Sequence, residues 1–265
     1  MDICTFWYGD RLRSVDWYCL SSMVKTGQKV KLYSHGSIEN VPKGVELIDA
    51  EPILPLEILY RLDPEFPNFK PNRTIVQFSD FFRVMLMKHQ AGVWLDTDVY
   101  LVKQFHPQED EVWLARENRQ RVGVSALYFP KDNPIIKEFE DYLKSDEMVP
   151  NWLGFRRRVW LPFLLRWKKL PVVPGRLGIT VFGNDGISRL AKRHGFFQKA
   201  KEKKTFYYWT GRDAERIFDP SYGLEPLNDS QFIGFHVHKK AKTEQVAQEG
   251  SFYFWAKKQI DHMSE

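Results

Sequence analysis

The chain has 265 residues, of which 43% are hydrophobic and 15% aromatic, so it can bury the core of one large domain. Its two cysteines, Cys4 and Cys19, exclude a disulfide-rich secreted scaffold and indicate buried thiols in a reducing compartment. The net charge of +5 comes from residues 151–265, with 21 basic against 11 acidic side chains, and this half fits either a polyanionic partner or an ordinary solvated surface.

The first 50 residues predict a β-α-β-β unit, the opening of an open α/β fold. The N-terminus lacks the basic and long apolar regions of a signal peptide, so residues 2–8 are expected to form a core strand. Ser14 is the expected N-cap of a helix that stops at Gly27, and strands are expected at 29–34 and 45–49. No apolar run approaches the length of a transmembrane span, which predicts a soluble or peripheral protein.

The middle of the chain begins with an irregular stretch. Residues 50–74 are rich in proline and lack clean periodicity, so they predict a surface segment with a short helix at 56–62. Ser79 is the expected cap of a helix that runs to about Gln90. The later elements are expected, in order, as strands at 93–95, 112–116 and 123–129, helices at 134–144 and 186–194, strands at 205–209 and 231–238, and a last helix at 252–262.

The most specific chemical feature is the run Trp94-Leu95-Asp96-Thr97-Asp98. Asp96 and Asp98 stand two residues apart directly after an apolar strand, so their carboxylates point the same way in an extended segment. Ligands of open α/β sheets bind at the carboxyl ends of strands, and paired carboxylates there suit Mn²⁺ or Mg²⁺ bridging two phosphates. An Asp-x-Asp alone is a weak signal, and a turn with two solvated aspartates is the alternative.

One helix upstream, Asp80 and Arg83 stand three residues apart and share a helical face. A carboxylate beside a guanidinium can grip the vicinal hydroxyls of a sugar, one accepting and the other donating hydrogen bonds. The alternative is an ordinary helix-surface ion pair. A metal-dependent phosphoryl-transfer enzyme would explain Asp96 and Asp98 but not this pair.

The run SDFFRVMLMKHQAGVWLDTDVYLVK resembles the sugar-binding block of the DXD glycosyltransferases of the GT-A type. That family includes yeast mannosyltransferases, globoside-type galactosyltransferases and many bacterial surface-polysaccharide transferases. The shared pattern joins a Ser-Asp-x-x-Arg helix, a Gly-Gly-x-Trp turn and Asp-x-Asp, with Ala91 here in place of the first glycine. The segments FWYGDRL, KVKLYSH and VELIDA are also similar to the start of that family.

The resemblance implies an α/β fold of the GT-A (Rossmann-like) class, with a mixed sheet flanked by helices and a smaller helical, basic C-terminal part. Residues 1–265 would form one domain, in which 1–130 bind the nucleotide sugar and 131–265 form the acceptor side. Asp98 would be the direct metal ligand. Asp96 would contact the donor and reach the metal through water, which makes both aspartates catalytic.

The resemblance also implies donor-binding roles for other side chains. Asp80 and Arg83 would hold the transferring sugar. The aromatic residues that end the first strand would bind the base, with core packing as the alternative for Trp7; they are Phe6, Trp7 and Tyr8.

Two later segments match the family more faintly. Asn184 and Asp185 lie in a stretch similar to the family's Gly-Pro loop, with Asn184 in place of proline; the alternative for Asp185 is a helix N-cap. His236 would complete the metal shell, although His238 faces the same side of an extended strand and a structural histidine is the alternative.

The implied activity is transfer of a hexose or N-acetylhexosamine from a nucleotide sugar, expected to be a UDP-sugar, to a hydroxyl of a glycan or glycolipid. Retention, Mn²⁺ or Mg²⁺, and a place in surface polysaccharide or lipopolysaccharide synthesis at the inner, cytoplasmic face of a bacterial membrane follow from the same resemblance. A non-catalytic sugar-binding protein is the alternative from another class. Nucleic acid is not an expected partner because no known binding motif occurs and the N-terminal half is acidic. The sequence indicates no oligomeric state.

Residues 151–170 combine basic and aromatic side chains in the run WLGFRRRVWLPFLLRWKK. This pattern fits a peripheral element in contact with an anionic membrane. It also fits an acceptor site for an anionic glycolipid or polysaccharide, or a basic amphipathic helix packed on the core with Pro162 at a kink. The sequence leaves these three interpretations open.

Overall fold

The computed structural model describes residues 1–237 and 247–262, and its centre is a six-stranded mixed sheet in the order β3-β2-β1-β4-β7-β6. Strands β3, β2, β1 and β4 run parallel, whereas β7 is antiparallel to both β4 and β6. This is the mixed α/β sheet expected from the sequence. The strands are β1 (Ile3–Phe6), β2 (Val30–Ser34), β3 (Val45–Asp49), β4 (Val93–Leu95), β6 (Trp113–Arg116) and β7 (Val122–Tyr128).

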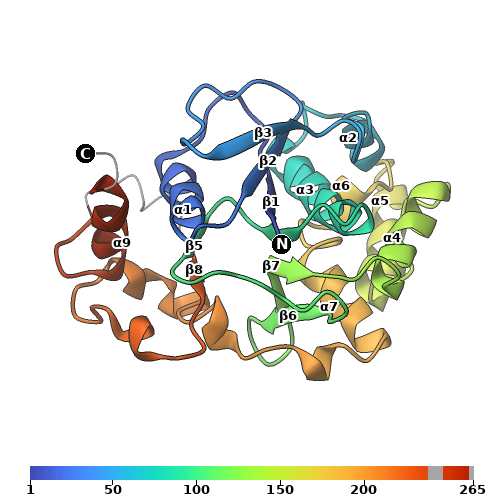
Figure 1. Cartoon of the computed structure of the whole chain (residues 1–265). Helices are drawn as coiled ribbons and strands as arrows, with labels where there is room; N and C mark the ends of the chain where they lie inside the picture. The colour runs from blue at the N-terminus through green and yellow to red at the C-terminus, as the bar shows by residue number, and fades with distance from the viewer. Residues whose placement is uncertain (238–246, 263–265) are drawn as a thin grey trace.

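Helices flank this sheet on both sides. Figure 1 shows α1 on one side of the strands, and α3, α4 and α7 on the other. Each is amphipathic or largely buried, and none of the helices in the described part of the chain is long and apolar enough to cross a bilayer. The α-helices are α1 (Ser14–Lys25), α2 (Ile58–Leu62), α3 (Pro71–Lys88), α4 (Pro134–Lys144), α5 (Leu161–Trp167), α6 (Pro174–Leu177), α7 (Asn184–Arg193) and α9 (Phe252–Asp261).

A second, two-stranded sheet ties the end of the chain to its beginning. Strands β5 (Val99–Leu101) and β8 (Gly234–His236) pair antiparallel, with Val99 opposite His236. They share an apolar cluster with α1 and α9, built around Cys19, Tyr100 and Phe252. The C-terminal part therefore packs on the outer face of α1, as Figure 1 also shows.

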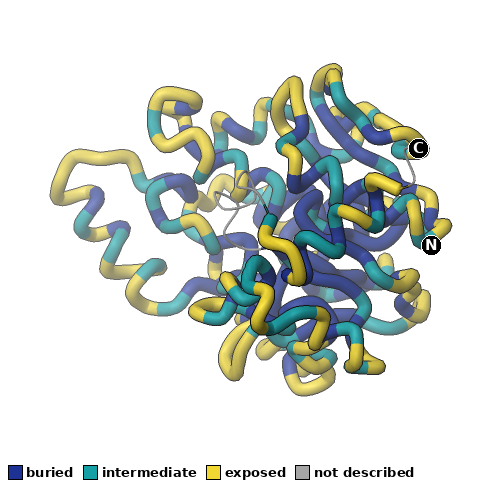
Figure 2. Tube along the Cα trace, turned by 90° about the vertical axis from the view of Figure 1, so that its left-hand side faces the viewer, coloured by how far each residue is buried: buried dark blue, intermediate teal, exposed yellow. Residues whose placement is uncertain are grey.

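Most strand residues are buried, with the edge strand β3 as the exception, and the other exposed stretches lie mainly in the surrounding helices and loops (Figure 2). Cys4 and Cys19 are both buried and form no disulfide bond, as expected from their apolar neighbours. The parallel pairing of β1 with β4 brings their carboxyl ends to the same edge of the sheet. Polar residues that follow the two strands therefore meet at one place.

Two predicted helix starts are wrong. α3 begins at Pro71 and not at Ser79, because a proline at the first helical position is already fixed near helical φ. The additional turns bury Thr74 and Gln77. Because these buried residues are polar, the hydrophobic periodicity of a helix is not visible in this part of the sequence. α1 has Arg13 at its N-cap and not Ser14, which is the first helical residue and makes no capping hydrogen bond.

The predicted strand at 205–209 is also wrong. The chain forms a 3₁₀ turn at Lys203–Thr205, and Tyr207 donates its backbone N–H to the Lys203 carbonyl. The aromatic residues there have high strand propensity, but they are buried one after another without alternation. Strand β5 was not predicted, β8 covers only part of the predicted 231–238 strand, and His238 lies outside the described residues.

Candidate functional site

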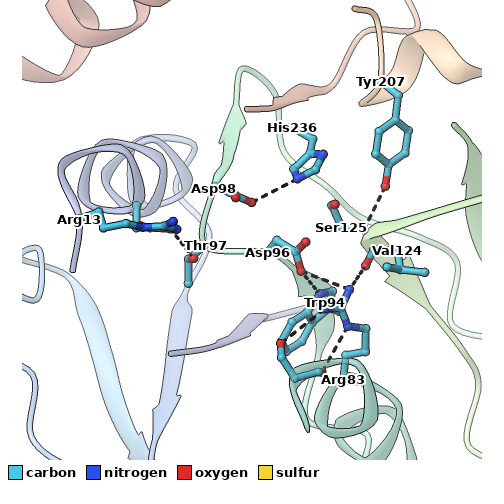
Figure 3. A network of polar contacts seen from close by, with 12 residues as sticks. Arg13, Arg83, Trp94, Asp96, Thr97, Asp98, Val124, Ser125, Tyr207 and His236 are labelled. Carbon is cyan, nitrogen blue, oxygen red and sulfur yellow. Dashed lines mark hydrogen bonds and ion pairs between the residues drawn. The ribbon is translucent and has the colours of Figure 1, made fainter. Parts of the chain in front are cut away.

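The Asp96-Thr97-Asp98 loop joins β4 to β5 and is held by backbone hydrogen bonds on both sides. The Asp96 N–H donates to the Ser125 carbonyl at 2.7 Å, on the neighbouring strand β7. The Val237 N–H donates to the Asp98 carbonyl at 2.9 Å, just beyond β8. The loop is thus fixed between the large and the small sheet, with both carboxylates at the edge where β1 and β4 end (Figure 3).

Asp96, Asp98 and His236 form a cluster that could hold a metal ion. One ligand atom from each lies within 4.8 Å of the others, and the His236 Nε2 is 3.4 Å from the Asp98 Oδ1. The Asp98 side chain is only 2% exposed, whereas that of Asp96 is 23% exposed. Two carboxylates and an imidazole on a rigid backbone are a donor set that fits a divalent cation. His236 reaches this cluster because β8 pairs with β5.

Arg83 is the centre of the polar network beside the cluster. Its guanidinium donates to the Val124 carbonyl at 2.6 Å and lies 3.3 Å from the Asp96 Oδ1 and 3.1 Å from the Asp80 Oδ1. It also lies 4.8 Å from the centre of the Trp94 ring, and the Trp94 Nε1 donates to Asp96 at 2.8 Å. Arg83 therefore fixes the orientation of Asp96 as well as carrying positive charge into the site (Figure 3).

Asp80 is almost fully buried beside Arg83. Burial raises the pKa of its carboxyl to about 7, because the positive charge of Arg83 only partly offsets the loss of solvent and the negative charge of Asp96 adds to it. Gly183 packs directly against this carboxylate: a Cβ at position 183 would lie 2.3 Å from the Asp80 Oδ2. The Asp80 carboxyl thus loses its proton near neutral pH, and its close contact with Gly183 leaves no room for a larger side chain there.

We expect Asp80→Asn to change how stability depends on pH. In the wild type, the unfolded carboxyl ionises near its model value of 3.8 but the folded one only near 7, so this group opposes folding increasingly as pH rises between these values. The free energy of unfolding of Asp80→Asn, relative to wild type, should therefore rise from about pH 4 to about pH 7 and then level off. Urea denaturation in EDTA measures this, and a difference that is flat across the range would contradict it.

A second polar network, from α1, supports the loop from behind. The Thr97 hydroxyl donates to the Asp16 Oδ1 at 2.6 Å, and the Arg13 Nη2 donates to the same carboxylate at 2.8 Å. Burial, helped by the negative charge of Asp98, raises the pKa of Asp16, although Arg13 and Thr97 oppose this. Asp16 therefore connects the residue between the two loop aspartates with the cation at the start of α1.

The sequence analysis did not identify Arg13, Asp16 or Thr97 as site residues. The spacing of Arg13 and Asp16 at a helix start was a detectable signal for an ion pair. Their contact with Thr97 spans 81 residues of sequence and had no such signal.

Tyr207 was also missed, and it supports β7 from inside. Its buried hydroxyl accepts the Ser125 N–H at 3.0 Å, and its ring lies edge-on to His236 with centroids 5.9 Å apart. Gly123 makes room for it, because a Cβ there would lie 2.0 Å from the Tyr207 Cζ. Tyr207 links the strand that holds Asp96 with the histidine of the metal cluster (Figure 3).

Two cavities meet at this network, and both are lined by Val76, Arg83 and Asp96. The first cavity, of about 460 Å³, also reaches Asp98. The second, of about 330 Å³, also reaches His236. The first is lined further by Phe6, Trp7, Tyr8, Arg13, Asn72, Ile75, Ser79, Trp94 and Thr97, and the second by Asp80, Glu117, Arg121, Val124, Ser125, Ile179, Thr180, Asn184 and Tyr207.

The three aromatic residues at the end of β1 all line the first cavity but differ in exposure. Phe6 is buried and packs on Phe78 and Phe82, so it mainly forms the floor. Trp7 is half-buried, and the Arg13 guanidinium lies 5.1 Å from the centre of its ring. Trp7 also donates from its Nε1 to the Arg11 carbonyl at 3.2 Å, which holds its ring beside the cavity.

The first two residues of α7, Asn184 and Asp185, are predicted site residues that lie in different surroundings. Asn184 lines the second cavity and donates to the Glu117 Oε2 at 2.8 Å. Asp185 is not among the residues lining either cavity, and its carboxylate pairs with Arg157 at 3.1 Å and with Arg189 at 3.2 Å. The N-cap of α7 is Gly183, so Asp185 belongs to the first turn of the helix and does not cap it.

Residues 20–120 match the family model described as glycosyltransferase sugar-binding region containing DXD motif. This part of the chain is therefore similar to the sugar-binding region of DXD-motif glycosyltransferases. No curated protein sequence matches it. Among solved structures it is similar to one described as PaToxG glycosyltransferase, with 16% sequence identity and a TM-score of 0.40, over 72% of this chain and 68% of that chain.

The DXD match contains only part of the site. It includes Asp80 and Arg83 on α3 and both aspartates of the loop, but it leaves out Trp7 and His236. The roles of those two residues rest on the geometry described above: one lines the first cavity, and the other completes the metal cluster.

Proposed function

We propose that this DXD glycosyltransferase is metal-dependent and transfers a hexose or N-acetylhexosamine from a nucleotide sugar, most simply a UDP-sugar, to a hydroxyl of a glycan or glycolipid. The single observation that carries the proposal is the cluster of Asp96, Asp98 and His236 at the junction of two cavities. A donor consists of a nucleotide and a sugar joined by a diphosphate, and this arrangement offers one space for each part on either side of a cation-binding cluster.

In this proposal the first cavity receives the nucleotide. Trp7 offers a ring face to the base, and Arg13 lies on the same wall with positive charge for a phosphate. A divalent ion held by Asp96, Asp98 and His236 would neutralise charge on the diphosphate leaving group. Arg83, fixed by the Val124 carbonyl, adds charge at the same junction without having to reorganise.

The second cavity receives the sugar and then the acceptor. Asp80, when ionised, accepts hydrogen bonds from sugar hydroxyls, and Arg83 beside it donates them. Residues 1–130 thus supply most of the donor site. Asn184, Tyr207 and His236, from the acceptor half 131–265, close it. Retention at the anomeric carbon fits this proposal, since a leaving phosphate on the same face can accept the proton of the attacking hydroxyl.

The acceptor class is the finer part of the proposal. Resemblance of the DXD block to surface-polysaccharide transferases supports an acceptor in capsule or lipopolysaccharide synthesis, made at the cytoplasmic face of a bacterial membrane. The basic excess of residues 151–265 supports an acceptor that carries negative charge.

A donor panel tests the proposal. Purified protein with Mn²⁺ is incubated with each common nucleotide sugar, and released nucleotide is measured with and without EDTA. We expect slow hydrolysis of one donor that EDTA abolishes and added Mn²⁺ or Mg²⁺ restores. If no donor is hydrolysed and calorimetry detects no metal-dependent binding of any of them, the chain does not act as a metal-dependent transferase.

A further inference from the structure

The helical segment from Phe155 to Leu170, called the aromatic-basic helix below, presents large apolar side chains to solvent. It runs from the π-turn Arg156–Trp160 into α5 and ends just beyond it. Six of the 13 exposed large hydrophobic residues in the described part of the chain lie within it, 37% to 74% exposed. Scattered exposed hydrophobics are ordinary, but such a concentration marks an interaction surface. The six are Phe155, Val159, Trp160, Phe163, Trp167 and Leu170.

The exposed side chains follow helical spacing and lie opposite the face that packs on the protein. Pro162 and Leu165 are buried, and Leu161 packs against the main core. The stripe formed by Trp160, Phe163 and Trp167 advances by three and four residues and therefore lies on one side of the helix. The first two rings of this stripe, Trp160 and Phe163, are stacked with centroids 5.9 Å apart. The helix is anchored by one face, while its more aromatic face points outward.

Positive charge surrounds this stripe. Arg156, Arg158, Arg166, Lys168 and Lys169 all have exposed side chains. The sequence contains no Asp or Glu from residue 148 to residue 184, so no neighbouring acid in the chain offsets them locally. An apolar partner alone would leave these charges without counterions, and a polyanion alone would leave the aromatic rings in water.

We propose that the aromatic-basic helix docks on an anionic lipid bilayer. Trp and Phe favour the interface between headgroups and acyl chains, and Arg and Lys beside them are attracted to anionic headgroups. One such surface matches both features of the helix at once. Of the three interpretations that the sequence left open, this one fits the outward orientation of the rings; a helix with its aromatic face on the core does not.

The aromatic-basic helix is joined to the second cavity by Arg157. Its guanidinium donates to the Thr180 hydroxyl at 3.2 Å and pairs with Asp185 at 3.1 Å. Thr180 lines the second cavity together with Ile179, whose side chain is 45% exposed at the rim. A protein docked through this helix holds the cavity near the headgroups. Resting on the proposed function, the acceptor is therefore a glycan presented on a lipid.

Vesicle co-sedimentation of the full chain tests the docking. The probes are vesicles of phosphatidylcholine alone and of phosphatidylcholine mixed with phosphatidylglycerol, without donor or metal. We expect sedimentation with the anionic vesicles, little with the neutral ones, and weakening with salt. Phe163→Ser with Trp167→Ser should lower the partition coefficient at least tenfold, and Arg166→Gln with Lys168→Gln and Lys169→Gln should do the same.

The matched control is Tyr60→Ser, which removes an exposed aromatic side chain on α2 and should leave sedimentation unchanged. Donor hydrolysis without vesicles should be unaffected in all three variants, so failure of docking and failure of the proposed function are distinguishable. Four results would overturn the docking. Two come from sedimentation: no sedimentation of the wild type, or equal sedimentation of the double serine variant. The others are a wild-type dimer in light scattering that the double serine variant abolishes, and binding of RNA by the wild type in place of vesicles.

Discussion

Asp98→Asn should reduce metal-dependent donor hydrolysis by about 10²–10³-fold while the protein stays folded. Asp98 is the most buried member of the metal cluster, and its carboxylate faces His236. Asparagine keeps the shape of the side chain but removes the negative charge that a hard divalent cation needs. The measurements are turnover at saturating Mn²⁺, Mn²⁺ affinity by calorimetry, and thermal unfolding in EDTA.

The control for this variant is Asp132→Asn, which makes the same chemical change at an exposed position far along the chain and should behave as wild type. A loss of turnover together with at least tenfold weaker Mn²⁺ binding supports the role of Asp98 as a ligand. If Asp98→Asn keeps turnover within tenfold of wild type and still requires Mn²⁺, the cation does not depend on this carboxylate.

Gly123→Ala should destabilise the protein by about 1–3 kcal/mol or more, and it should also weaken metal binding. The added methyl would lie 2.0 Å from the Tyr207 Cζ inside the core, so the ring or strand β7 must move. Tyr207 accepts the Ser125 N–H, and the Ser125 carbonyl accepts the Asp96 N–H. A shift of the Tyr207 ring would therefore displace Ser125 on β7. It would thereby also displace the loop that contains Asp96 and Asp98.

Gly36→Ala is the matched control, because a Cβ there meets no atom within 4 Å. Urea denaturation in EDTA measures the change in the free energy of unfolding, and calorimetry measures Mn²⁺ affinity. Equal stability of the two glycine variants would show that Tyr207 does not fill the space above Gly123. A less stable Gly123→Ala with unchanged Mn²⁺ affinity would show that the packing does not support the metal site.

Local patterns in the sequence selected residues that the structure brings together at the centre of the candidate site. Asp96 and Asp98 follow an apolar strand, and Asp80 and Arg83 share one helical face, so short-range spacing was enough to find them. The structure joins these two pairs through the contact between Arg83 and Asp96. The same local logic predicted the central strands and the helix at 134–144, where side-chain periodicity and a proline start agree.

Contacts between distant segments could not be predicted in this way. Asp16 reaches Thr97 across 81 residues, and Tyr207 reaches Ser125 across 82. Both contacts depend on how α1 and the loop after the 3₁₀ turn pack against the sheet. No short sequence pattern predicts that packing. The outward orientation of the aromatic-basic helix could not be predicted either. A stripe of aromatic residues has the same spacing in the sequence whether it packs on the core or faces solvent.

The pairing of β8 with β5 has a consequence for the time at which the candidate metal cluster forms. During synthesis, the strands of the large sheet and the DXD loop leave the ribosome well before the segment that contains His236. The cluster of Asp96, Asp98 and His236 can therefore be completed only after β8 has been translated. A nascent chain that already has its central sheet but not β8 therefore contains only two of the three members of this cluster.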